Sequence, residues 1–114
     1  MPNLDGTRFR VTQTAAAGVV SSNTVLELQQ RGVRVVGRYR GGSIARGCLV
    51  GMVSDAGVQF RYVQREESGQ LHAGHSSCTI KVSTDGRRLL REHFTWETRA
   101  GSGINVFEEI TAAS

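Results

Sequence analysis

The chain has 114 residues and a formal net charge of +4, and it contains 14 glycines but only one proline. This length fits a single domain, residues 1–114, with a modest core. The lack of an apolar stretch of about 18 residues excludes a membrane-spanning helix, and the N-terminus lacks the basic and apolar regions of a secretory signal.

Turn-forming sequences recur about every 11 to 17 residues and separate segments in which apolar and polar residues alternate. This spacing suits antiparallel hairpins and is too short for parallel crossover units. The segment 15–23 could form a helical turn, but it reads better as a loop. The expected strands are 6–13, 20–30, 33–40, 44–53, 57–66, 70–82, 86–98 and 103–111.

This pattern predicts an all-β fold, an eight-stranded antiparallel up-and-down meander that closes into a barrel of the lipocalin or avidin type. Closure is the simplest outcome because it removes the exposed edge strands. A half-open, strongly curved sheet that dimerises is the alternative. The comparison with these barrels concerns architecture and implies no function.

The turn types predict how neighbouring strands pair. Loops that end in glycine suggest three-residue connections at 67–69 and 84–86, a three-residue loop is also considered at 41–43, and two-residue turns are expected at 31–32 and 55–56. These registers agree on one interior face. Its expected residues are Leu26, Leu28, Val35, Tyr39, Leu49, Val53, Phe60, Tyr62, Ile80, Leu90, Phe94 and Trp96, together with Gly37, Gly47, Gly51 and Gly74.

One carboxylate, Glu92, shares this face with the apolar residues of its strand. A three-residue loop at 99–101 would pair Glu92 with Glu108, beside Cys78. Two adjacent buried carboxylates cannot easily both ionise. They would need a shared proton, an arginine, a tyrosine donor, or a bound ligand or cation.

The expected ligand-binding residues are Glu92, Glu108, Tyr39, Tyr62 and Trp96, with His72 at one mouth. A purely structural role for the two carboxylates remains the alternative. Catalysis is less favoured, because no nucleophile or oriented histidine accompanies them. Two carboxylates and one distant histidine also form a poor metal site. We therefore predict no catalytic residue, metal or cofactor.

The outer face is rich in arginine, which supplies 13 of the 14 basic residues. Outward arginines flank an apolar stripe on the three central strands, and apolar residues outside a small barrel favour subunit contact. A plain solvated surface is the alternative, and nucleic acid is disfavoured because no exposed aromatic pair is expected. The arginines are Arg34, Arg38, Arg40, Arg46, Arg61 and Arg65, with Arg38 expected beside Arg46 and Arg46 beside Arg65. The stripe comprises Val36, Cys48 and Val63, with Val50 and Met52 next to it.

The two cysteines, Cys48 and Cys78, fall on strands that are not neighbours. We therefore expect free thiols and a reducing, cytoplasmic location.

Four runs of the sequence carry a family resemblance: "GRYRGGSIARGCLVGMVSDAGVQFRY", "GQLHAGHSSC", "DGRRLLREHFTWET" and "GSGINVFEEI". From about residue 24 onward the chain resembles a family of small uncharacterised bacterial β-barrel proteins, some of which are labelled N-acetylglutamate synthase. The resemblance implies no catalytic residues. The acetyl-CoA loop Arg/Gln-x-x-Gly-x-Gly/Ala is also missing, so the residues do not support that activity. The matching positions are Tyr39, Gly41, Gly42, Gly47, Leu49, Gly51, Tyr62, Gly74, Glu92, Trp96, Glu108 and Glu109.

Together these features predict binding of a small polar or amphipathic ligand inside the barrel or at its mouth. The alternative is a structural or interaction module with a filled core, which acts through the arginine-rich outer sheet in homo-oligomers or with an acidic partner. An eight-stranded barrel can be filled by its own side chains or can hold one small ligand, so the fold alone does not decide between them.

Overall fold

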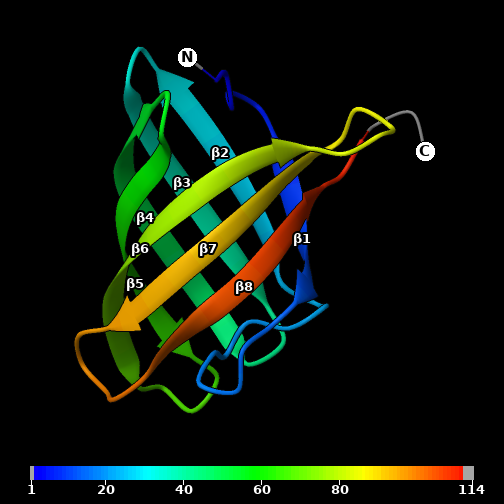
Figure 1. Ribbon diagram of the computed structural model, residues 1–114. Coiled ribbons are helices and arrows are strands. Elements are labelled where there is room, and N and C mark those ends of the chain that lie inside the picture. Colours follow the sequence, from blue (N-terminus) through cyan, green and yellow to red (C-terminus); the bar gives the residue numbers. More distant parts are fainter. Residues whose placement is uncertain (1, 112–114) are drawn as a thin grey trace.

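The computed structural model describes residues 2–111 and shows a closed barrel of eight antiparallel strands in the order β1 to β8 (Figure 1). This confirms the predicted fold class. No helix in the described part of the chain is long and apolar enough to cross a membrane. The strands are β1 (Arg8–Gln13), β2 (Val25–Arg31), β3 (Arg34–Gly41), β4 (Ile44–Ser54), β5 (Gly57–Glu66), β6 (Leu71–Val82), β7 (Arg88–Trp96) and β8 (Ser102–Glu109).

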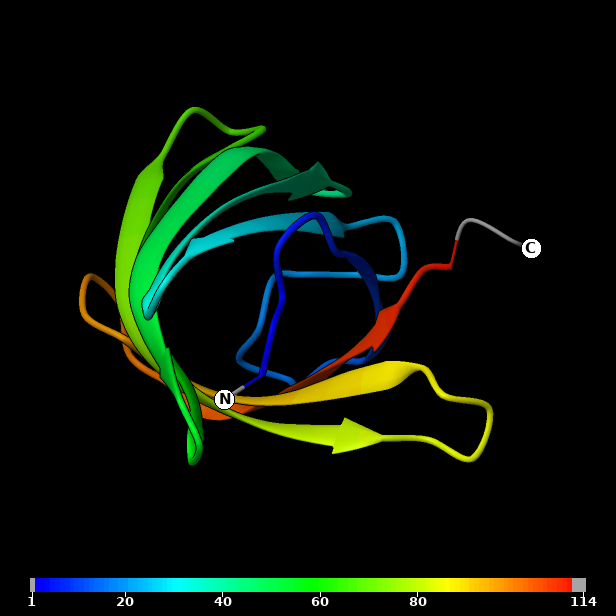
Figure 2. The ribbon, with the colours of Figure 1, turned by 90° about the horizontal axis from the view of Figure 1, so that it is seen from above.

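Pairing between the first and last strands closes the barrel. Phe9 of β1 lies opposite Glu109 of β8, and Val11 lies opposite Phe107. Seen along its length, the sheet curves fully round on itself (Figure 2). This closure rules out the half-open sheet.

The predicted registers of three hairpins are confirmed. Between β5 and β6, Gly74 lies opposite Tyr62 and His72 opposite Gln64. Between β6 and β7, Cys78 lies opposite Glu92 and Gly74 opposite Trp96. Between β4 and β5, Gly51 lies opposite Phe60. The loop before β7 has the expected Gly86 with a positive φ of 85°, a conformation that glycine adopts without steric cost.

Two other hairpins differ from the prediction by two residues. Leu26 lies opposite Tyr39 instead of Gly37, because Gly32, with φ 59°, takes the first central turn position. Arg38 lies opposite Cys48 instead of Arg46, because the register of β3 with β4 shifts after Tyr39. A shift of two residues preserves the face on which each side chain lies. The predicted interior is therefore unchanged.

The last hairpin carries the one error that changes a face. Thr95 pairs with Ser102, and the Trp96 amide donates to the Gly101 carbonyl, so the connection is longer than the predicted three residues. The pairing moves by three residues, and an odd shift turns every side chain of β8 over. Glu92 consequently lies opposite Asn105, and the predicted pairing with Glu108 is wrong.

The interior face is filled as the sequence predicted. Ten of the twelve predicted interior side chains are buried, and Phe60 and Ile80 are partly buried against them. Inward glycines make room for rings: a Cβ on Gly47 would lie 2.3 Å from the Tyr39 ring, and one on Gly74 would lie 2.4 Å from the Tyr62 hydroxyl. These glycines therefore accommodate aromatic side chains instead of leaving an empty space.

Both cysteines are free, as expected. Cys48 faces outward from β4 and is exposed, whereas Cys78 lies in the core.

The two ends of the barrel are covered differently. At one end the N-terminal segment crosses the opening, and Leu4 is completely buried there (Figure 2). The other end is covered by residues 14–24, the β1–β2 loop, which lies beside the loops that follow β5 and β7 (Figure 1). Ala15, Ala17, Val19 and Val20 of this loop pack against the core. We call this second end the loop end.

Candidate functional site

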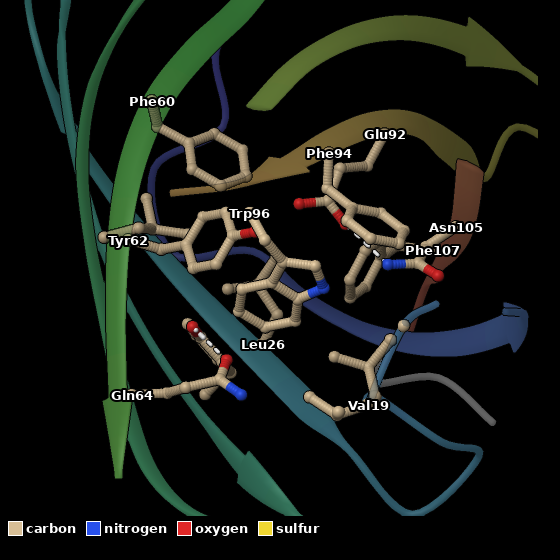
Figure 3. A pocket seen from close by; sticks show the side chains of 14 residues that line it. Val19, Leu26, Phe60, Tyr62, Gln64, Glu92, Phe94, Trp96, Asn105 and Phe107 are labelled. Atoms are coloured by element: carbon tan, nitrogen blue, oxygen red, sulfur yellow. Dashed lines mark hydrogen bonds between the residues drawn. The ribbon is translucent and has the colours of Figure 1, made fainter. Parts of the chain in front are cut away.

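A small cavity lies inside the barrel beneath the β1–β2 loop (Figure 3). Its free volume is about 30 Å³, which is room for one or two water-sized groups. A second void of about 10 Å³ lies between core side chains. The larger cavity is lined by Gly18, Val19, Val20, Leu26, Tyr39, Leu49, Phe60, Tyr62, Gln64, Glu92, Phe94, Trp96, Asn105 and Phe107.

A polar cluster surrounds the inward carboxyl of Glu92. Its Oε2 accepts a hydrogen bond from Ser76 Oγ at 2.6 Å, and its Oε1 accepts one from Asn105 Nδ2 at 2.9 Å. Glu92 is 6% exposed. Burial raises the pKa of this carboxyl, and the hydrogen bonds from Ser76 and Asn105 offset only part of that rise.

A second polar chain runs from the interior to the loop end. The Tyr39 hydroxyl donates to Gln64 Oε1 at 2.9 Å, and Gln64 Nε2 donates to Glu66 at 3.0 Å. Arg99 donates to the same carboxylate at 2.9 Å and lies 4.7 Å above the Trp96 ring. Burial raises the pKa of Glu66, but the bonds from Arg99 and Gln64 outweigh it and leave that pKa lowered.

Aromatic rings form one wall of the cavity. Trp96 packs edge-on against Tyr62 at 5.5 Å and against Phe94 at 6.0 Å between ring centroids. The Tyr62 hydroxyl makes no hydrogen bond to any residue of the described chain, although the ring itself is buried. The cavity therefore combines an aromatic wall with polar groups, one of which has a free hydrogen-bonding capacity.

The β1–β2 loop is tied to two residues that line the cavity. Asn105 Oδ1 accepts a hydrogen bond from the Ala15 amide at 3.2 Å, and Trp96 Nε1 donates one to the Ala17 carbonyl at 2.9 Å. The loop thus closes the cavity through its main chain.

Two glycines before and within β8 allow the loop to sit this close. A Cβ on Gly103 would lie 2.5 Å from the Cβ of Ala15, and one on Gly101 would lie 2.9 Å from the Cβ of Ala17. Only glycine at these positions leaves room for the loop in its observed place.

Four of the six predicted ligand-binding residues line this cavity: Tyr39, Tyr62, Glu92 and Trp96. His72 lies at the loop end but does not line the cavity. Its ring packs in a T-shaped arrangement with Trp96, 6.1 Å between ring centroids, and its Nδ1 lies 2.8 Å from Thr98 Oγ1.

The structure contradicts the predicted inward position of Glu108 beside Glu92. Glu108 lies opposite Leu89 on the outer face and pairs with Arg87 at 2.9 Å. The cause is the longer connection before β8, which places Asn105 and not Glu108 beside Glu92.

Three polar residues of the interior were missed from the sequence: Ser76, Gln64 and Asn105. Alternation along the strand already indicated Gln64, because it follows Tyr62 by two residues. The same alternation indicated Ser76, because it lies two residues after the inward Gly74. Asn105 was hidden by the wrong length of the last loop.

Comparison with known proteins gives one result. A family model described as "Avidin-like protein" matches residues 2–110. No curated protein and no solved structure matches the chain.

Proposed function

The chain belongs to the avidin-like protein family, whose small β-barrels typically bind small ligands, and on this premise we propose that it binds a small amphipathic ligand inside its barrel. The observation that carries the proposal is the cavity itself. Polar atoms of Glu92, Asn105 and Tyr62 lie among aromatic side chains beneath a loop. A few placed polar groups in an apolar, concave site are typical of small-molecule binding.

The free volume of about 30 Å³ means that a ligand of more than a few atoms must displace the β1–β2 loop. Three hydrogen bonds to side chains hold the part of the loop nearest the cavity. Asn105 accepts one from the Ala15 amide, Trp96 donates one to the Ala17 carbonyl, and Ser43 Oγ donates one to the Val19 carbonyl at 3.2 Å. Each such bond contributes about 1 kcal/mol. Because its side chains there are small, we expect this loop to open at modest cost.

Trp96 provides the test, because it is the only tryptophan in the chain and lies in the cavity wall. We expect small amphipathic molecules to change its fluorescence saturably. The Tyr62→Phe variant removes a hydroxyl that makes no bond within the described chain, so it should fold with unchanged stability but bind polar ligands more weakly.

The control for this test is Arg38→Ala, on the outer face of β3, which should bind like the parent protein. Saturable binding that Arg38→Ala abolishes and Tyr62→Phe leaves intact would place the ligand outside the barrel and defeat the proposal.

A second candidate function is self-association through the outer face of β3 to β5. Val36, Val50, Met52 and Val63 are between 46% and 66% exposed there. Ion pairs lie at both sides of this stripe, Arg38 with Glu27 and Arg61 with Glu97. An aliphatic centre with a polar rim is the usual composition of a subunit contact.

Sedimentation velocity tests this second candidate. We expect the parent protein to sediment as an oligomer at micromolar concentration and a Val50→Lys, Met52→Lys double variant to sediment as a monomer. The matched control, Thr12→Lys, adds charge at an exposed position of β1, a strand that carries no residue of the stripe, and should leave the oligomer intact. A monomeric parent protein would dismiss the idea.

We also propose that the protein resides in a reducing compartment, the cytoplasm, because both of its cysteines are free thiols.

A further inference from the structure

We propose that the ligand of this cavity is a small organic cation, an amine whose ammonium group pairs with the carboxylate of Glu92. This inference rests on the proposed binding function and names the chemical class of the ligand. It follows from the charges, the rings and the space around Glu92.

Glu92 has hydrogen-bond donors but no counter-charge. Both donors, Ser76 and Asn105, are neutral, and no ion pair with an arginine, lysine or histidine is found for Glu92 within residues 2–111. Arg99, whose guanidinium lies over the ring of the cavity residue Trp96, is already paired with Glu66. A buried carboxylate without a cation is costly, and a cationic ligand would remove that cost.

The rings around the cavity also suit a cation. Tyr39, Tyr62, Phe94 and Trp96 line the same space as Glu92 (Figure 3). The faces of such rings attract cations, and aromatic enclosures are a common way to bind ammonium groups. Trp96 already holds one cation, since the Arg99 guanidinium lies over its ring on the loop side.

The free space matches the head of such a ligand. An ammonium group is similar in size to water, and about 30 Å³ is available between the residues that line the cavity. The organic part would extend between Leu26, Phe107 and Val19, which line the rest of the cavity, and would displace the β1–β2 loop. Glu92 and Tyr62 would accept hydrogen bonds from the ammonium.

Glu92 is the group whose titration would control this binding. The other titratable groups that face it are Tyr39 on β3, Tyr62 on β5 and Cys78 on β6, and burial raises the pKa of each, so they stay neutral. Burial also raises the pKa of Glu92. An amine must therefore displace a proton at low pH, and its binding should strengthen as the pH rises through the folded pKa of Glu92. Binding should weaken again near about pH 10, where an alkylamine loses its own proton.

The experiment compares three probes on the full chain that share a phenylethyl group and differ in the polar head: 2-phenylethylamine, 2-phenylethanol and 3-phenylpropanoate. Trp96 fluorescence gives the affinity of each at several pH values. We expect the amine to bind roughly tenfold or more tighter than the alcohol at pH 8 and the carboxylate to bind weakest. In Glu92→Gln, whose amide oxygen can still accept from Asn105 and whose NH2 group can donate to Ser76 Oγ, the charge is removed and this preference should disappear.

The outcomes separate the two proposals. If the alcohol binds in the cavity and the amine binds no tighter, the inference that the ligand is a cation is wrong, but the proposed binding function stands. If none of the three probes changes Trp96 fluorescence saturably, the proposed function fails with it. Should Glu92→Gln not fold, the parent protein still decides the matter, because only the amine should gain affinity between pH 4.5, the ordinary pKa of the carboxyl, and about pH 9, up to which an alkylamine stays charged. An amine affinity that is flat over this range would overturn the inference.

Discussion

Glu92 sits among Ser76, Asn105 and Cys78 with no contact to a cation of the described chain. Its inward direction follows from strand alternation, since Leu90, Phe94 and Trp96 share its face. The residue thus faces the interior because of the fold. Its chemistry is unusual for that position, because the carboxyl is satisfied by neutral donors only.

The raised pKa of Glu92 predicts a specific pH dependence of stability. The ordinary value is 4.5 and the folded value is higher, so the folded state binds the proton more tightly than the unfolded state. The stability contributed by the buried neutral carboxyl is complete below pH 4.5 and is lost as the pH rises through the folded pKa. The slope in that range is up to about 1.4 kcal/mol per pH unit.

Denaturant unfolding of the parent protein and of Glu92→Gln at several pH values measures this effect. Glutamine mimics the neutral acid, so the variant should match the parent near pH 4.5 and become relatively more stable as the pH rises. Other carboxyls, such as Glu66 and Glu109, cancel in the difference between the two proteins. A difference that does not change with pH would show that Glu92 titrates normally.

The β1–β2 loop is the element that decides access to the cavity. Its place depends on small residues on both sides, Ala15 and Ala17 on the loop and Gly101 and Gly103 beneath it. Such close packing of small residues has no sequence signature of its own, since alanine and glycine occur in many loops. The sequence predicted that 15–23 forms a loop, but not that this loop covers the barrel.

Replacing Gly103 by alanine should displace the β1–β2 loop from its packed position against β8. The new Cβ would lie 2.5 Å from that of Ala15 and 3.2 Å from the Phe94 ring. We expect faster amide exchange at Ala15 and Gly18 and stronger quenching of Trp96 by acrylamide. The barrel itself should lose less than about 3 kcal/mol of its free energy of unfolding.

The control for this change is Ser102→Ala, one residue earlier on the exposed side of β8. It should leave the exchange rates and the quenching as they are in the parent protein. Unaltered loop exchange in Gly103→Ala would mean that the loop is held by something other than its fit to Gly103.

Hairpins differ in how well the sequence predicts their register. The loop at 84–86 has one glycine at its end, and its pairing was predicted correctly. The turn at 41–43 has two glycines with positive φ, and the connection before β8 contains Gly101, with Gly103 two residues later inside the strand. Where several glycines compete for the left-handed position, the loop length becomes ambiguous. That ambiguity concealed Asn105 and misplaced Glu108.

The closed barrel itself was predictable, because eight alternating strands with short turns leave few other arrangements. The two segments that cover its ends could not be predicted, because both are irregular and their position depends on the completed barrel. Leu4 is fully buried at one end, and the Ala15 amide is bonded at the other. The sequence therefore predicts the wall of the site and most of its residues, whereas its closure emerges only in the structure.

We propose that a small ligand enters the barrel at the loop end and displaces the β1–β2 loop from Trp96. The most direct measurement is a two-dimensional ¹H–¹⁵N NMR titration with 2-phenylethylamine, in which the single indole N–H of the chain is resolved. We predict saturable shifts of the Trp96 indole, of the amides of Ala15 to Val20 and of Asn105, with Val50 on the outer face unchanged. Shifts confined to the outer face of β3 to β5, or saturable shifts that leave the Trp96 indole signal unchanged, would show that the ligand does not enter the barrel.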